Sequence, residues 1–293
     1  MTTKSVPFPP RPRARIAAAL AALLLLSGCS GLKLGYAFAE DMLESRAKKY
    51  LELDTAQEIE VRKHTEALVA WHRKTMLPRY AAYLNAQAEI VEAGGWDRAQ
   101  LAAAFAGFRA LLDETVAGAA PFIAEALMHH TTPAKTGYLK ARMDETIAEY
   151  RKSEADETPD EAVAEWIERR VDRIERFTGA LTEAQLAVIR RYAETEVDRS
   201  MRWIDNREKR QAAFLTLLRS EPTRERVAHF VHRVLLHAHE IVDPDYRAIS
   251  EARWAVRERL YFDVLSIMTD AQRREVVETL RDYAKDIREL AGE

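Results

Sequence analysis

Four histidines and two carboxylates lie close together in the last third of the chain, and these residue types bind transition metals. They are His229, His232, His237, His239, Glu240 and Asp243. On a helix, His232 and His239 would share a face but lie about 10 Å apart along the axis, too far for one ion. His229 and His232 are closer, but no His-Glu-x-x-His pattern or third ligand accompanies them. We therefore expect no bound metal and interpret this segment as a partly solvated helix flank.

A second group of chemically useful side chains lies in the segment WHRKTMLPRY. Trp71, His72, Arg73 and Tyr80 could stack on and hydrogen-bond a carboxylate or a sugar, or contact a partner protein. The same residues recur at spacings of three and four, which is typical of a helix face packed in a core. Both interpretations stay open. The ligand interpretation includes an enzyme, a hydrolase or lyase, that cleaves an envelope polymer in a cleft near Trp71 and His72.

Sequence signatures of common enzyme classes are missing from the chain. It contains no Gly-x-Ser-x-Gly elbow and no glycine-rich phosphate loop. Carboxylates alternate with arginines at helical spacing, as in Glu165, Glu168 and Arg169, which indicates solvated ion pairs. We assign no catalytic residue and no cofactor, and favour a non-enzymatic role. A site assembled from distant helices stays an open alternative.

The N-terminal segment has the pattern of a secretory signal peptide. An apolar run of 11 residues, 16–26, follows a basic start without acidic residues and precedes small residues. The run is too short for a transmembrane helix, which needs roughly 20 apolar residues. The basic residues of this start are Lys4, Arg11, Arg13 and Arg15.

The single cysteine of the chain directly follows this segment. The residues Leu26-Ser27-Gly28-Cys29 resemble the lipobox of bacterial lipoproteins. This resemblance implies cleavage between Gly28 and Cys29, acylation of Cys29, and contacts with the lipoprotein processing and sorting machinery. Because Ser30 rather than aspartate follows the cysteine, the resemblance implies an outer-membrane anchor with the polypeptide in the periplasm. Residues 29–35 would form a short lipidated tether.

Composition limits the functions of the mature chain. Removal of residues 1–28 leaves 40 Lys+Arg against 47 Asp+Glu, a net charge of −7. An acidic exported protein is a poor candidate for nucleic-acid binding, which favours a basic surface. With no cysteine besides Cys29, the chain forms no internal disulfide, so its stability must come from packing.

The chain is predicted to be all-α, an elongated multi-helix bundle of about 8–10 helices joined by short capped turns. Glycine is scarce, at 10 residues, and strong helix formers dominate. The polar stretch 152–161 divides an N-terminal helical half, 36–153, from a C-terminal half, 154–293, unless the two form one continuous domain. The expected helices are 36–51, 55–92 with a disturbance at Pro78, 97–117, 120–129, 133–153, 159–178, 183–218, 222–242, 245–267 and 270–290.

Three short segments carry the pattern of a helix-capping box. In this motif the first side chain accepts a hydrogen bond from the amide three residues later, and the glutamine reaches back to the first amide. The pairs are Asp54 with Gln57, Thr182 with Gln185, and Thr269 with Gln272. We interpret them as helix starts. The segment Leu181 to Gln185 also resembles the LTxxQ motif of small periplasmic helical chaperones, which cradle unfolded clients.

A broader resemblance covers most of the mature chain. The lipobox, the segment YAFAEDML, the start at Asp54, the segment WHRKTMLPRY and the later boxes are similar to a family of all-helical proteobacterial lipoproteins of unknown function. This resemblance implies location and fold and carries over no catalytic residue. The expected role is a non-catalytic binding, scaffold or chaperone-like protein of the cell envelope that contacts envelope proteins. The alternative is an envelope-polymer hydrolase or lyase.

Overall fold

The protein is an all-α multi-helix bundle, as the composition predicted. The computed structural model describes residues 28–196, 202–237 and 244–293, and the regular structure within these ranges is entirely helical. None of the described helices combines the length and the apolar character that a bilayer-spanning segment requires. The first six are α2 (Gly28–Ala37), α3 (Ala39–Tyr50), α4 (Thr55–Thr75), α5 (Leu77–Glu92), α6 (Arg98–Leu127) and α7 (Pro133–Asp156).

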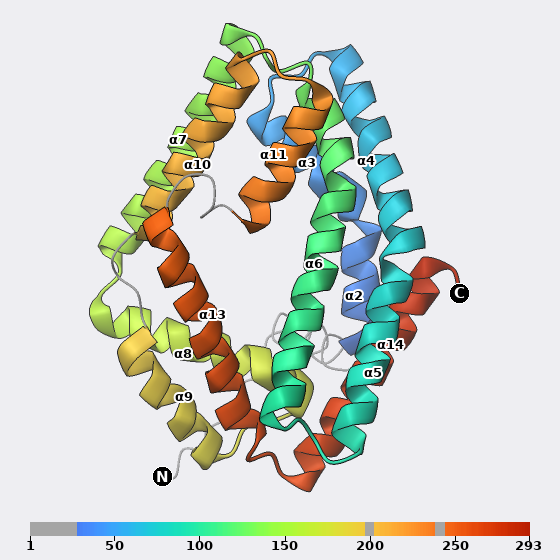
Figure 1. Ribbon diagram of the computed structural model, residues 1–293, viewed down its shortest axis with the longest axis vertical. Helices are drawn as coiled ribbons and strands as arrows, with labels where there is room; N and C mark the ends of the chain where they lie inside the picture. Colours follow the sequence, from blue (N-terminus) through green and yellow to red (C-terminus); the bar gives the residue numbers. More distant parts are fainter. Residues whose placement is uncertain (1–27, 197–201, 238–243) are drawn as a thin grey trace, which may run out of the picture.

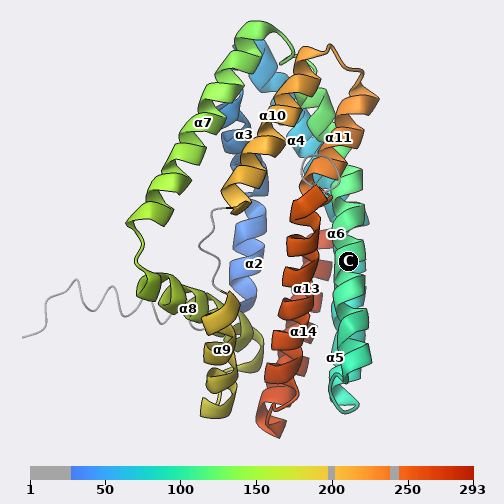
Figure 2. The same ribbon diagram turned by 60° about the vertical axis from the view of Figure 1, so that its left-hand side comes forward.

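The helices of the second half complete the bundle by packing on those of the first. The most extensive contacts join α14 to α5 and α11 to α6, and α10 packs along α7. Figure 1 shows α4, α5, α6 and α14 on one side and α7 to α10 with α13 on the other. In Figure 2, α6, α13 and α14 run along the long axis and α7 is inclined to them. The later helices are α8 (Pro159–Thr178), α9 (Glu183–Glu196), α10 (Arg202–Arg219), α11 (Arg224–Leu236), α13 (Pro244–Leu265) and α14 (Asp270–Ala291).

Two prolines have different effects on the expected helices. Pro78 lies in the first turn of α5 and separates it from α4, since proline lacks the amide that would continue the helix. Pro121 instead lies inside α6, so the two helices expected over 97–117 and 120–129 are one. Ala120 and Ala124, on either side of Pro121, are buried in the core shared with α11. This packing outweighs the cost of the missing hydrogen bond.

The stretch expected to be a tether, 29–35, is helical and forms most of α2. α2 packs against α14, where Lys33 lies 2.9 Å from the buried carboxylate of Asp286 and also pairs with Glu289. Leu32 and Tyr36 pack on the core cluster that contains Ile287. The segment directly after Cys29 is therefore held on the body of the protein.

The three predicted capping pairs all make both reciprocal hydrogen bonds. Two of them are also joined to each other. Gln272 Nε2 donates to Gln185 Oε1 at 2.9 Å and to the backbone carbonyl of Ala180. Gln185 Nε2 donates to the carbonyl of Val264 at the end of α13, and both glutamine side chains are buried. The starts of α9 and α14 and the end of α13 thus share one buried polar network.

α4 approaches α6 closely at Trp71. The indole lies over Gly118 of α6, where a Cβ atom would overlap its ring atoms, and its ring centroid is 6.2 Å from that of Phe122. Gly118 is therefore a packing requirement of this helix pair rather than a turn residue.

We expect Gln272→Ala to lower the free energy of unfolding by about 2 kcal/mol or more, because it removes the buried hydrogen bond to Gln185 Oε1 and the side-chain donor to the carbonyl of Ala180. Gln100→Ala is the matched control, since Gln100 makes the same backbone contact to Asp97 in an exposed capping box. That control should cost about 1 kcal/mol or less. Urea unfolding followed by circular dichroism measures both, and equal losses would contradict a special role for the buried network.

Gly118→Ala should destabilise the protein by about 1–3 kcal/mol, because the added methyl group forces Trp71 out of its position. Gly137→Ala is the control: Gly137 lies in the interior of α7, and a Cβ there would meet no atom within 4 Å. This control should stabilise the chain by about 0.5–1 kcal/mol, since alanine favours helix. Thermal melting distinguishes the two, and a rise in melting temperature for both variants would refute the close packing at Trp71.

Candidate ligand-binding cavity

Six helices of the upper part of the molecule in Figure 1 enclose a cavity of about 670 Å³. This volume is within the range of small-molecule sites, roughly 300–1,000 Å³. α3, α4, α6, α7, α10 and α11 all contribute side chains. Its apolar lining residues are Leu43, Ala47, Tyr50, Leu51, Val61, Leu68, Phe122, Ile123, Ala126, Leu127, Leu139, Met143, Tyr150, Phe214, Val231, Val234 and Leu235.

The wall of the cavity is continuous with the hydrophobic core. Leu127, Leu139 and Val231 are almost fully buried and belong to the core cluster that joins α6, α7 and α11. At the rim, Leu43 and Leu235 are exposed over 40% and 53% of their surface. The cavity is therefore fixed by packing at its base and reachable from solvent at its edge.

The charged residues that line the cavity are all arginines: Arg46, Arg207 and Arg210. Arg207 and Arg210 lie three residues apart on α10, on the same face as Phe214. The Nε atoms of both are buried and have no hydrogen-bond partner in the described part of the chain. Arg207 also lies 5.3 Å from the centre of the Tyr150 ring, which fixes its guanidinium against α7.

The two carboxylates of α10 form ion pairs with α7. Asp205 and Glu208 both accept hydrogen bonds from Arg151 of α7, at 3.0 Å and 2.9 Å. Burial, with the nearby charge of Arg207, lowers the pKa of Arg210. The lowered pKa expresses the cost of holding this cation away from water without an anion. The cavity thus presents positive charge that no described lining residue neutralises.

Such a cavity can accommodate a molecule with an anionic head and an apolar tail. A carboxylate accepts charge-assisted hydrogen bonds from guanidinium groups, often two at once. An alkyl chain gains about 25 cal/mol for each Å² of apolar surface that it buries. His64, Thr65 and Gln211 supply further polar contacts to the lining.

The predicted group at Trp71, His72, Arg73 and Tyr80 forms a packed aromatic cluster and does not line this cavity. His72 Nδ1 lies 3.1 Å from the hydroxyl of Tyr36, and the His72 ring lies 5.5 Å from that of Tyr80. The Arg73 guanidinium lies over the Tyr36 ring, and the Tyr80 hydroxyl forms a hydrogen bond with the hydroxyl of Thr115. Burial lowers the pKa of His72, so this imidazole is neutral near pH 7. Its close partners are aromatic rather than acidic, which favours the packing interpretation.

The predicted histidine group is divided by the structure. His229 is exposed on α11, and His239, Glu240 and Asp243 lie outside the described residues. His232 and His237 instead meet Asp113 of α6. The expectation of no metal considered ligands on one helix only, whereas the carboxylate of Asp113 comes from a helix 119 residues earlier in the chain.

Cys29 and Gly28 lie at the start of α2, and the preceding residues are outside the described part of the chain. The lipidation and cleavage at these residues therefore stay predictions.

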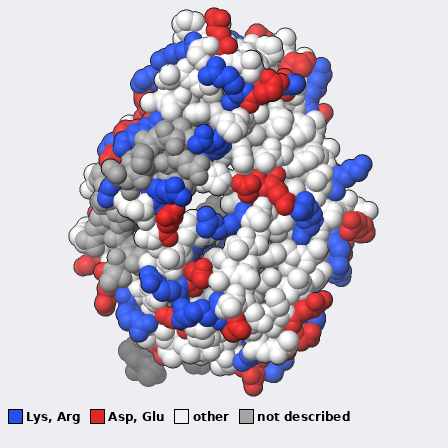
Figure 3. All heavy atoms as spheres, in the orientation of Figure 1, with Lys and Arg blue, Asp and Glu red and all other residues white. Residues whose placement is uncertain are grey.

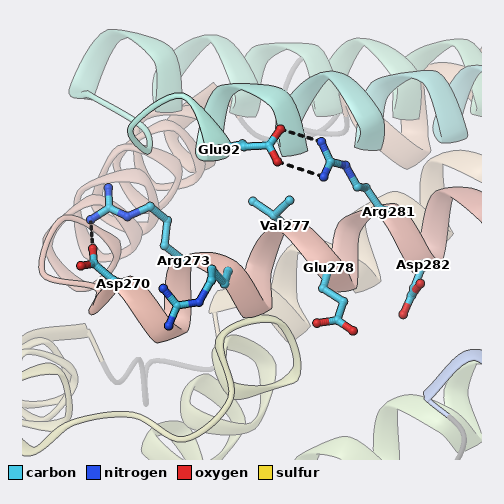
Figure 4. Close-up of a pocket in the computed structure, with 8 residues that line it drawn as sticks. Glu92, Asp270, Arg273, Val277, Glu278, Arg281 and Asp282 are labelled. Atoms are coloured by element: carbon cyan, nitrogen blue, oxygen red, sulfur yellow. Dashed lines mark hydrogen bonds and ion pairs between the residues drawn. The ribbon is translucent and has the colours of Figure 1, made fainter.

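A second surface hollow, lined mainly by α14, contains both acidic and basic side chains. Figure 4 shows Glu92 in a two-pronged pair with Arg281, at 3.1 Å and 2.7 Å, and Asp270 beside Arg273. The hollow therefore contains charges of both signs, whereas the charged residues that line the larger cavity are all arginines. On the face in Figure 3, acidic and basic side chains are interspersed. This distribution is unlike the one-sided basic surface of nucleic-acid-binding proteins.

Arg207 and Arg210 were not predicted as site residues from the sequence. A usable signal was present, because the two arginines share a helical face with Trp203 and Phe214. Cations on an otherwise apolar helix face are uncommon in a core and indicate either a buried ion pair or a ligand site.

Comparison with known proteins identifies the family and nothing more specific. No curated protein matches the chain, and no solved structure matches it. One family model matches residues 49–247, which include most of the cavity lining. The chain therefore belongs to the family described as a family of unknown function (DUF6279).

Proposed function

We propose that the chain is a lipid-anchored, non-catalytic binding protein of the cell envelope that holds a single-chain anionic amphiphile, of the fatty-acid class, in the six-helix cavity. One observation carries the proposal: Arg207 and Arg210 have unpartnered buried Nε atoms in an apolar cavity whose described lining contains no carboxylate. The anchor on Cys29, the periplasmic face of the outer membrane and contact with envelope proteins complete the proposed role.

The energetic reason is the cost of burying the Nε atoms of Arg207 and Arg210 without a hydrogen-bond partner. Nearly all buried charges in proteins are paired or hydrogen-bonded, because desolvation without a partner is expensive. A ligand carboxylate would supply the missing partner, and its tail would cover the apolar wall made by α6, α7 and α11. The same cavity rejects neutral and cationic heads, since neither offsets the arginines.

An exposed apolar stripe supports attachment to a membrane. Leu34, Phe38 and Met42 follow one another at four-residue spacing and are exposed over 60%, 52% and 66% of their surface. The stripe begins five residues after Cys29, on the helices α2 and α3. An acylated Cys29 would bring these side chains to the bilayer surface, where apolar residues of a helix insert.

The chaperone-like alternative, in which the LTxxQ segment binds clients, has less support. Gln185 is fully buried, and its amide hydrogen-bonds Gln272 and Val264. A side chain with its polar atoms occupied inside the core cannot also contact a client.

A soluble form that begins at Gly31 should bind laurate in isothermal titration calorimetry, and the double variant Arg207→Gln with Arg210→Gln should bind it at least about tenfold more weakly. A charge-assisted hydrogen bond contributes roughly 1.5–3 kcal/mol, and about 1.4 kcal/mol is a factor of ten in affinity. Ala47→Phe, which fills the cavity without removing charge, should also weaken binding.

The matched control is Lys209→Gln, which removes a charge from the exposed side of the same helix. It should leave laurate affinity unchanged. The double variant should melt at or above the parent temperature, because it removes two partly buried charges whose Nε atoms have no partner. A double variant that unfolds more easily but binds laurate normally would mean that the arginines are structural, and equal affinity for laurate and neutral dodecyl maltoside would also overturn the proposal.

Cys29→Ser should abolish both the incorporation of a clickable palmitate and the sedimentation of the protein with membranes, because a hydroxyl does not replace the thiolate that is alkylated by the diacylglyceryl group. Ser27→Ala keeps a small residue before the cleavage site and serves as the control that retains the label. Continued labelling of the Cys29→Ser protein would show that the anchor is elsewhere.

A further inference from the structure

Three potential metal ligands from two helices converge at the lower end of α11. His232 lies on α11, His237 ends that helix, and Asp113 projects from α6. Both imidazole Nε2 atoms lie near the same oxygen, Asp113 Oδ1, at 3.1 Å and 3.2 Å. One ligand atom from each of the three residues lies within 4.8 Å of the others.

We propose that Asp113, His232 and His237 bind a divalent transition-metal ion, with zinc as the physiological candidate. In a tetrahedral zinc site, metal–ligand bonds of about 2.0–2.1 Å place neighbouring ligand atoms about 3.3 Å apart. The separations between Asp113 Oδ1 and the two nitrogens are close to this value. Two imidazoles and one carboxylate form a donor set that suits zinc, whereas calcium and magnesium prefer oxygen ligands alone.

The helix packing holds the ligands in place before an ion binds. α6 and α11 form one of the most extensive contacts of the molecule, with Val227 and Val231 of α11 buried against Ala120 and Ala124 of α6. Asp113 and His232 therefore face each other across a fixed interface. A preformed site avoids the ordering cost that weakens binding to flexible ligands.

The site is accessible to an ion from solvent. The side chains of Asp113, His232 and His237 are exposed over 44%, 26% and 37% of their surface. Three protein ligands leave a fourth tetrahedral position for water, as in open zinc sites. The site is separate from the amphiphile cavity, whose lining includes none of the three residues.

Binding is tested by titrating zinc chloride into the untagged full-length chain, stripped with a chelator and kept in detergent. We expect one zinc ion per chain, and at least about tenfold weaker binding in each of Asp113→Asn, His232→Ala and His237→Ala. Loss of an outer-shell partner alone typically weakens metal binding by roughly 10- to 100-fold, and the loss of a ligand should do no less. Cobalt chloride gives a second readout, because four-coordinate cobalt absorbs visible light more strongly than the hydrated ion.

His229→Ala is the matched control, since His229 lies on α11 but is exposed and outside the group. It should leave both the zinc stoichiometry and the cobalt spectrum unchanged. Asp113→Asn keeps the size of the side chain, and its helical circular dichroism should match that of the parent. Absence of saturable zinc binding, several weak equivalents, or equal affinity in the parent and the Asp113→Asn and His237→Ala variants would overturn the proposal.

Discussion

The hydrogen bond between the buried side chains of Gln185 and Gln272 lies where α8, α9, α13 and α14 meet. Each glutamine already satisfies the first amide of its own helix, so the bond between them connects the starts of α9 and α14. Gln272 Nε2 also donates to the carbonyl of Ala180, just after α8, and Gln185 Nε2 donates to the carbonyl of Val264, at the end of α13. With no disulfide in the chain, this network and the apolar packing around it set the position of α14. α14 in turn supports α5 and α2, the helix that carries the predicted anchor.

Helix starts could be predicted from the sequence because capping is local. The side chain and the amide that it satisfies lie three residues apart, so the pairs at Asp54, Thr182 and Thr269 each identify a helix start to within a residue. The second function of the glutamines could not be predicted, because Gln185 and Gln272 are 87 residues apart. The single helix α6 was missed for a related reason. Proline at position 121 is locally unfavourable, and only the burial of Ala120 and Ala124 against α11 explains why the helix continues.

The candidate sites likewise depend on contacts between residues that are distant in the sequence, which local sequence patterns do not reveal. Trp71 and His72 were predicted as possible ligand contacts because they are adjacent polar aromatic residues. In the structure, Trp71 packs on Gly118, and His72 contacts Tyr36 and Tyr80. The arginines of α10 share a helical face with Trp203 and Phe214, which is a local signal, but the cavity around them forms only where six helices meet. Asp113 is one of many carboxylates in the sequence. Its proposed role as a metal ligand depends on the packing of α11 against α6, which brings two histidines next to it. Ligand sites between helices depend on the packing of segments that are distant in the sequence, whereas fold class depends on composition and periodicity.

α11 connects the two proposed sites. Val231, Val234 and Leu235 line the cavity, and His232 of the same helix turns toward Asp113. A metal ion would hold the end of α11 against α6 and would limit any outward movement of α11 that the amphiphile needs to enter or leave the cavity.

If both ligands bind, thermodynamic linkage requires that each changes the affinity for the other by the same factor. The sign of the coupling free energy depends on whether the amphiphile occupies the cavity with α11 packed on α6 or displaced from it. Because the buried base of the cavity is built from Val231 and Leu127 in the present arrangement, the held position preserves the apolar wall. Positive coupling therefore follows from the packing, with zinc favouring the closed cavity and the bound amphiphile favouring the metal site.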